Sequence, residues 1–175
     1  MANDVQATNG KPQASRLIFS AGYQKGEGTL LTWATIEEKL EKAQNYWLAT
    51  IHPNQRPHVT PIWGAWIDGA FYFDGIPTSR WARNLAANPS IAIHLESGDE
   101  VVIVEGMAED VESTDAELGA RIVAMWDEKY GRLHPEPATD GIFRLRPKRA
   151  RAWHNFPHDA TRWHFPNSTE NLSGG

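Results

Sequence analysis

The sequence predicts a mainly β fold (α+β): a small antiparallel β-barrel with a few flanking helices. Short stretches rich in aromatic and β-branched residues recur along the chain, and tight-turn residues such as the Asp68-Gly69 pair separate them. Helical periodicity is confined to a few segments, which argues against the regular strand–helix alternation of a parallel doubly wound sheet. With 175 residues, 41% of them hydrophobic, the chain can form one domain with a core.

The chain divides into one domain and two tails. Residues 1–30 are predicted to form a loose N-terminal tail, because Asn, Gln, Gly, Lys and Ser dominate there and the apolar patch at residues 17–19 is brief. We expect the ordered domain to span residues 31–168, followed by a C-terminal tail at residues 169–175.

The first helix is expected shortly after Thr32. Thr35 followed three positions later by Glu38 is typical of a capping box. Apolar residues at helical spacing then give the helix one buried face, which comprises Ile36, Leu40 and Ala43.

Three strands follow this helix, at residues 47–51, 59–67 and 70–73, where aromatic and branched residues gather. Asp68-Gly69 is a favoured two-residue hairpin turn, so these strands form an antiparallel meander. Residues 101–104 are apolar on both faces, which suits a strand covered by the barrel interior and by a helix or a second subunit. We therefore expect a homodimer.

The second half of the chain is predicted to hold one longer helix and the last strands. The helix spans residues 114–130 and ends at Gly131, because glycine commonly takes the left-handed conformation that stops a helix. The last strands are expected at residues 141–145, 149–153 and 162–165.

The segment Pro-Thr-Ser-Arg-Trp-Ala-Arg-Asn-Leu (residues 77–85) places two arginines and two hydroxyls where a strand becomes a helix. Backbone N–H groups at a helix start are unpaired, the helix dipole favours negative charge there, and arginine offers planar paired donors that match phosphate. This pattern predicts an anion site. The alternative is an ordinary capped helix with surface arginines.

The order of these segments resembles the pyridoxamine 5′-phosphate oxidase-like FMN-binding split-barrel superfamily, in its flavin- and deazaflavin-dependent oxidoreductase branch. An aromatic strand, a polar turn at residues 52–56, a second strand and the Asp68-Gly69 hairpin precede the arginine junction. The similarity continues through residues 88–95, 100–109 and 161–165. The resemblance implies a split β-barrel.

In that superfamily the cofactor lies in a groove at the interface of a homodimer. The resemblance places its ring on residues 58–63 and its phosphate on residues 78–84. His58 is also a candidate proton donor, and the other interpretation is a surface or core histidine. No other catalytic residue is assigned. The implied cofactor-binding residues are His58, Val59, Thr60, Pro61, Trp63, Thr78, Ser79, Arg80, Arg83 and Asn84.

The cofactor implied is the deazaflavin coenzyme F-420 or FMN. Trp81 departs from the oxidase-like pattern, which has a basic residue at this position, and we expect it to be a core anchor of the helix. Pyridoxamine phosphate oxidase activity itself is therefore not expected.

The resemblance implies an oxidoreductase that transfers a hydride to or from a conjugated small molecule. The alternative is a non-catalytic binding or carrier protein for a flavin-like or tetrapyrrole ligand, which the same groove would permit.

The amino-acid composition restricts the kinds of site and partner that we expect. The absence of cysteine excludes disulfides and thiolate metal sites, and the seven histidines lack helical metal-binding spacing, so no metal is expected. A net charge of −5 argues against nucleic acid, although residues 144–151 hold five cations, which either form a solvated strand end or meet the acidic groups of a cofactor. No run is apolar enough to cross a membrane and no secretory signal is visible, so a cytoplasmic location is expected.

Overall fold

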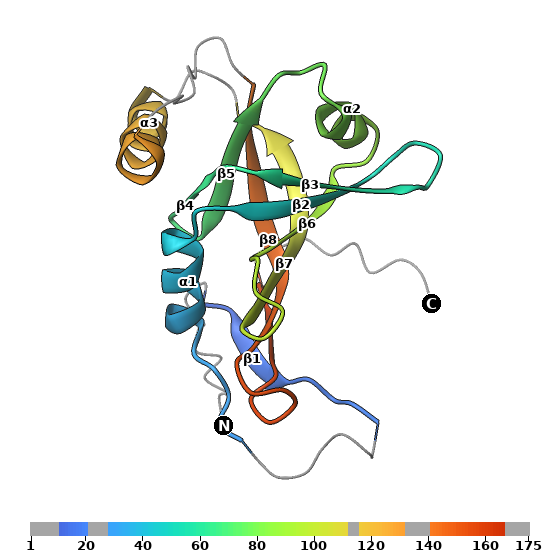
Figure 1. Cartoon of the computed structure of the whole chain (residues 1–175), viewed down its shortest axis with the longest axis vertical. Helices are drawn as coiled ribbons and strands as arrows, with labels where there is room; N and C mark the ends of the chain where they lie inside the picture. The colour runs from blue at the N-terminus through green and yellow to red at the C-terminus, as the bar shows by residue number, and fades with distance from the viewer. Residues whose placement is uncertain (1–10, 21–27, 112–115, 132–140, 167–175) are drawn as a thin grey trace, which may run out of the picture.

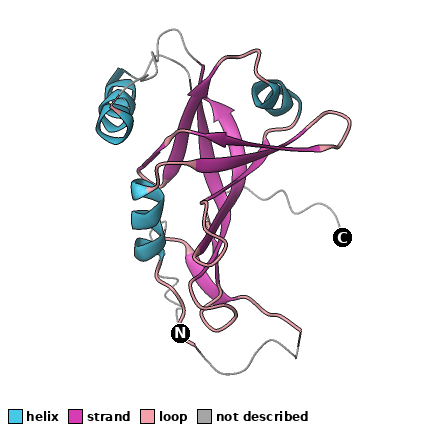
Figure 2. Cartoon of the chain, viewed as in Figure 1, coloured by secondary structure: helices cyan, strands magenta, loops and turns pink. Residues whose placement is uncertain are grey.

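The computed structural model of the protein describes residues 11–20, 28–111, 116–131 and 141–166 (Figure 1). These residues form one nine-stranded antiparallel sheet and three helices that flank it (Figure 2). The strands are β1 (Gln13–Arg16), β2 (Tyr46–Ile51), β3 (Pro57–Ile62), β4 (Ala65–Ile67), β5 (Ala70–Gly75), β6 (Ser90–His94), β7 (Val101–Asp110), β8 (Gly141–Trp153) and β9 (Thr161–His164). The helices are α1 (Trp33–Lys42), α2 (Arg80–Ala87) and α3 (Ala116–Tyr130).

The strand order is β1-β9-β8-β7-β6-β2-β3, and β5 joins β4 to β8. The long strand β8 pairs with β5 at its start and with β9 at its end, while β7 runs beside it throughout. β7 and β8 follow the long axis of the molecule, and β2 and β3 cross this direction (Figure 1). The mainly antiparallel β fold with flanking helices is therefore confirmed; the homodimer stays a prediction.

The core lies in two clusters. The larger one gathers residues from the inner face of the sheet under α1 and α2, and its fully buried members include Ile36, Leu40, Leu48, Phe71, Phe73, Ile93 and Leu145. The smaller one lies under α3, where Ile122 and Trp126 pack on Ile67, Ala70 and Tyr72.

The predicted hairpin at Asp68-Gly69 is confirmed. Both residues have positive φ, 49° and 75°, and Ile67 pairs directly with Ala70 across the two-residue turn. The strand predicted over residues 59–67 is instead two strands, separated at Trp63 and Gly64. A Cβ on Gly64 would lie 2.3 Å from the Phe71 ring, so only glycine lets the chain pass this close to β5.

The helix boundaries follow the capping residues. The capping-box prediction at Thr35 was wrong: Thr32 is the N-cap, since its hydroxyl accepts a hydrogen bond from the Thr35 N–H at 3.3 Å, and α1 starts at Trp33. The end of α3 is as predicted, because Gly131 has φ +62° and its N–H donates to Asp127 O at 2.9 Å. Residues 114–115, predicted to start this helix, lie outside the described residues.

The strands predicted at residues 141–145 and 149–153 are one continuous strand. Pro147 pairs with Gly106 and Arg149 with Glu105, which leaves Lys148 as an extra residue in a bulge. Proline lacks a backbone donor and is tolerated at such a bulge, so it does not end the strand.

The described part of the predicted N-terminal tail is not loose throughout. Residues 13–16 form β1, which pairs with β9, and Gln13 lies opposite His164. The Arg16 guanidinium donates to His158 O at 2.7 Å, which attaches β1 to the domain. Residues 1–10, 21–27 and 167–175, which include the predicted C-terminal tail, lie outside the described residues.

Candidate functional site

The predicted ring-contact residues divide between the two faces of β3. Pairing with β2 sets His58 opposite Thr50 and Val59 opposite Ala49, and cross-strand partners share a face. Burial alternates along β3 in the same way, with every second residue half-buried and the others exposed. The half-buried face carries His58 and Thr60, and the exposed face carries Val59 and Pro61.

The arginine junction forms a capped helix start. The Ser79 hydroxyl accepts a hydrogen bond from the Ala82 N–H at 3.3 Å, so Ser79 is the N-cap of α2. Thr78 precedes it and is exposed, and Arg80 and Arg83 are exposed on the first turn. The capped helix with surface arginines is thus observed, and the cap leaves both arginines at the surface beside the helix N-terminus, where the anion site stays a prediction.

Arg80 bridges α2 to the β2–β3 turn. Its Nη1 donates to His52 Nε2 at 2.9 Å. A guanidinium has only donors, so the imidazole nitrogen is the acceptor. A phosphate oxygen is a stronger acceptor than a neutral ring nitrogen, and Arg80 is therefore positioned at the turn while remaining able to exchange this partner for an anion.

Asn84 does not point at an anion outside the helix. Its side chain is 1% exposed, and Nδ2 donates to the Thr50 hydroxyl at 2.9 Å. The phosphate-binding role that the resemblance implies for Asn84 does not suit this position between α2 and β2. The helical spacing of the sequence could have indicated this burial. Asn84 lies three residues after Trp81 and one before Leu85, and all three lie on the same buried face of α2.

Asn84 is instead the first member of a chain of polar groups that reaches β3. Thr50 is 2% exposed, and its hydroxyl oxygen lies 3.3 Å from His58 Nδ1. Together with the contact between Arg80 and His52, this chain holds α2 against β2 on the face that carries His58. The structure thus links Asn84 to His58 through Thr50 and Arg80 to the turn before β3. It places Val59 and Pro61 on the opposite face of β3 from His58 and Thr60.

Beyond the far end of β3 the chain is enclosed by α3. The Trp63 ring stacks on Tyr130, with centroids 4.6 Å apart and an interplanar angle of 11°. The Tyr130 hydroxyl accepts from the Gly64 N–H and donates to Gly64 O, both at 3.0 Å. Lys129 Nζ donates to Gly64 O at 3.2 Å and to the Tyr46 hydroxyl at 2.9 Å. Trp63 is therefore held by the scaffold.

Burial shifts the pKa values of the ionisable groups in this enclosure. Desolvation lowers the pKa of Lys129 to about 8, because the ammonium group lies between the Tyr46 and Tyr130 rings, 5.1 and 5.9 Å from their centroids. Burial raises the pKa of Tyr46 and of Tyr130. No local pattern in the sequence indicated the contacts of Lys129 and Tyr130, because Tyr130 binds Gly64, a residue 66 positions earlier.

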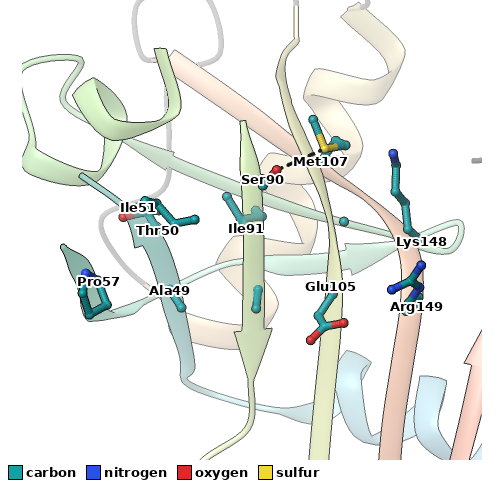
Figure 3. A pocket seen from close by; sticks show the side chains of 12 residues that line it. Ala49, Thr50, Ile51, Pro57, Ser90, Ile91, Glu105, Met107, Lys148 and Arg149 are labelled. Carbon is teal, nitrogen blue, oxygen red and sulfur yellow. Dashed lines mark hydrogen bonds between the residues drawn. The ribbon is translucent and has the colours of Figure 1, made fainter. Parts of the chain in front are cut away.

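A cavity of about 520 Å³ opens on the outer face of the sheet (Figure 3). It spans β2, β6, β7 and β8, with Lys148 and Arg149 at one side and Pro57 and Ile51 at the other. Most of its floor is apolar, and the Ser90 hydroxyl contacts Met107 Sδ at 3.6 Å. None of the predicted site residues lines it.

A second cavity, of about 680 Å³, shares the lining residue Arg149 with the first. Arg151 and Arg162, which face each other across β8 and β9, also line it. Arg151 pairs with Glu105 at 3.1 Å, and Arg162 Nε donates to the Ser15 hydroxyl at 3.3 Å. From the cationic run, Lys148 and Arg149 line the first cavity and Arg149 and Arg151 line the second. A contact of this run with a cofactor stays a prediction.

Other site types find no support in the described part of the chain. Within residues 11–20, 28–111, 116–131 and 141–166, no group of three His, Asp or Glu side chains is placed to hold a metal ion. Across the same residues, no helix is both long and apolar enough to span a bilayer.

A family model described as pyridoxamine 5′-phosphate oxidase matches residues 32–154. The chain belongs to this family. The match covers β2 to β8, and with them both ends of β3 and the arginine junction. No curated protein sequence matches the chain.

Solved structures agree with this assignment. An F-420 reductase is 27% identical with a TM-score of 0.53, over 65% of this chain and 94% of that one. A conserved hypothetical protein from Mycobacterium tuberculosis is 28% identical with a TM-score of 0.61, over 74% and 89%. A haem-storage protein from Vibrio cholerae, 24% identical with a TM-score of 0.55 over 66% and 89%, shares the fold. The split-barrel fold and the superfamily that the sequence resembles are thus confirmed.

Proposed function

We propose that this family member is a flavin- or deazaflavin-dependent oxidoreductase. It binds coenzyme F-420 or FMN in a groove at a homodimer interface and transfers a hydride to or from a conjugated small molecule. The observation that carries the proposal is the start of α2 with its exposed arginines, which two hydrogen bonds attach to the end of β2 and to the turn that leads into β3.

The donor set suits a phosphate. Backbone N–H groups at the α2 start, the exposed Arg80 and the exposed Arg83 are adjacent, and no carboxylate among the described residues pairs with either arginine. In this role the two guanidinium groups bind the phosphate and set the position of the attached ring.

The edge of the sheet beside this junction suits the edge of a flat ring. β3 ends the main strand order of the sheet, so within the described residues one side of its backbone has no strand partner and can hydrogen-bond a ligand. His58 and Thr60 add polar side chains on the face toward α2. When bound, the flavin or deazaflavin supplies the two-electron hydride chemistry, while these residues orient the ring.

The outer face of β3 is where we expect a second copy of the chain to pack. Val59 is 51% exposed on the outer face of β3, next to the apolar floor of the cavity that Ala49, Ile51 and Met107 help to line. An exposed apolar sheet face of this kind is commonly covered in an oligomer. Sedimentation of the purified protein tests the dimer directly.

The F-420 reductase among the similar structures supports turnover rather than storage, since it shares 27% identity with this chain across 94% of its own length. The Vibrio cholerae haem-storage protein shares the fold, so haemin serves as the control ligand in the binding test.

The test is a titration of cofactor-stripped protein with FMN, coenzyme F-420 and haemin, followed by absorbance and fluorescence. We expect micromolar or tighter binding of FMN or F-420, and oxidation of the reduced bound cofactor by an added conjugated acceptor. Binding of haemin alone, with an iron-dependent Soret band, would favour the carrier and overturn the oxidoreductase. Tight binding of FMN or F-420 without turnover of any acceptor would also point to a carrier.

A further inference from the structure

The hydrogen bonds around Thr50 bear on which ring nitrogen of His58 carries the proton. Thr50 and Asn84 are both almost completely buried, so neither exchanges its partner with solvent. Asn84 Nδ2 can only donate, which makes the Thr50 oxygen its acceptor at 2.9 Å. The one proton of the Thr50 hydroxyl is then available to His58 Nδ1, 3.3 Å away.

The orientation of the Asn84 amide supports this direction. As placed, its Oδ1 is buried without a hydrogen-bond partner among the described residues, while Nδ2 is paired. The flipped amide would pair the oxygen and leave the whole NH₂ group buried without an acceptor. Unpaired buried N–H groups are rarer than unpaired carbonyl oxygens, so the observed orientation is the favoured one.

An imidazole that accepts at Nδ1 carries its proton at Nε2 when it is neutral. His58 is half-buried on the face of β3 toward α2, and its Nε2 makes no hydrogen bond to any residue in the described part of the chain. In that tautomer its Nε2–H is a donor, on the edge strand β3, that has no acceptor among the described residues.

We propose that Asn84 and Thr50 are positioning residues that fix His58 as the Nε2–H tautomer, so that His58 donates a hydrogen bond to an acceptor atom on the ring edge of the bound ligand. The ligand class is a heteroaromatic ring with carbonyl or nitrogen acceptors on its rim. The ligand part rests on the proposed function; the tautomer does not. Asn84 thereby acts on the ring through His58, although the family resemblance assigns it to the phosphate.

The experiment is long-range ¹H–¹⁵N NMR of the ligand-free protein labelled with ¹⁵N-histidine, at a pH where His58 is neutral, with His58→Gln to assign the signals. We expect wild-type His58 to show the Nε2–H pattern. Thr50→Ser keeps the hydroxyl and should keep the pattern, whereas Thr50→Val removes it and should give a mixture of tautomers. Thr50→Val should also weaken cofactor binding about fivefold to tenfold, and Thr50→Ser less than twofold.

An Nδ1–H pattern in the wild-type protein would overturn the proposal, and so would an unchanged Nε2–H pattern in folded Thr50→Val. Circular dichroism checks that this variant folds; if it does not, the wild-type and Thr50→Ser spectra still decide. The predicted tautomer in a protein that binds neither FMN nor F-420 would refute the proposed function and leave the positioning intact. Cofactor binding with the opposite tautomer would refute the positioning alone.

Discussion

At its first residues β3 lies beside exposed arginines and a turn, whereas beyond its last residue the chain is enclosed by aromatic rings. His58 has a ring nitrogen without a partner among the described residues, and Arg80 and Arg83 are exposed. Gly64, by contrast, has both its backbone groups hydrogen-bonded by α3. The two ends of one six-residue strand therefore differ in whether their polar groups are already satisfied.

This difference distinguishes groups that can bind a ligand from groups that stabilise the fold. Groups that are exposed and not fully paired can take a ligand at little cost, because few existing contacts are lost. Groups that are buried and paired contribute to stability, and changing them removes those contacts or leaves partners unsatisfied. We call the start of β3, which lies beside the arginines, the α2 end, and the chain just beyond β3, which α3 encloses, the α3 end. Substitutions at the α3 end should therefore alter the free energy of unfolding, and those at the α2 end should alter the affinity for the cofactor.

The largest effect is expected for Gly64→Ala. Its Cβ would meet the Phe71 ring at 2.3 Å and Tyr72 O at 2.6 Å, and overpacking of this kind costs about 3 kcal/mol. Urea unfolding measures the loss. Gly98→Ala is the control, since nothing lies within 4 Å of its added Cβ, and it should stay within about 0.5 kcal/mol. Equal stability of the two variants would mean that the α3 end is not tightly enclosed.

A smaller loss is expected for Tyr130→Phe. The ring still stacks on Trp63, but the hydroxyl that serves both backbone groups of Gly64 is gone, which costs about 1–3 kcal/mol. Unfolding measures this loss, and a cofactor titration of the same variant should show affinity within about twofold of wild type. A large loss of affinity with normal stability would place the ligand at the α3 end instead.

How much of this arrangement could be predicted depended on whether the signal was local. The hairpin at Asp68-Gly69 and the stop at Gly131 each rest on a few neighbouring residues, and the sequence predicted both. A capped helix start at residues 78–80 was the alternative interpretation of the arginine junction, and Ser79 is the cap. The contact between Gly64 and Tyr130 joins segments 66 residues apart and left no local pattern. Asn84 shows the limit of resemblance, because the motif matched while the side chain lies beneath the helix.

Stability should also depend on pH through Lys129. Burial lowers its pKa to about 8 in the folded protein, against about 10.4 in an unfolded chain, so the unfolded state binds more protons between these values. The free energy of unfolding should therefore rise from pH 8 to about 9.5, before unfolded tyrosines ionise. Lys129→Met should remove this rise, as followed by urea unfolding at successive pH values; a rise that persists in the variant would assign it to another group.

The smallest effect on stability is expected for Arg80→Ala combined with Arg83→Ala. Both side chains are exposed, and the pair loses only the hydrogen bond from Arg80 to His52, so the free energy of unfolding should change by less than about 0.5 kcal/mol. Thermal unfolding checks this. A loss above about 2 kcal/mol would show that the arginines support the scaffold.

The assignment of the phosphate to the start of α2 is tested most directly by calorimetry with ligands that carry or lack a phosphate. The two comparisons are FMN against riboflavin, and coenzyme F-420 against its phosphate-free deazaflavin nucleoside. Wild-type protein should prefer the phosphate-bearing ligand by at least about tenfold, and the Arg80→Ala/Arg83→Ala variant should lose this preference. Arg121→Ala with Arg146→Ala, which removes two exposed arginines elsewhere, should retain it. A preference that survives the loss of Arg80 and Arg83 would contradict the assignment of the phosphate to the start of α2.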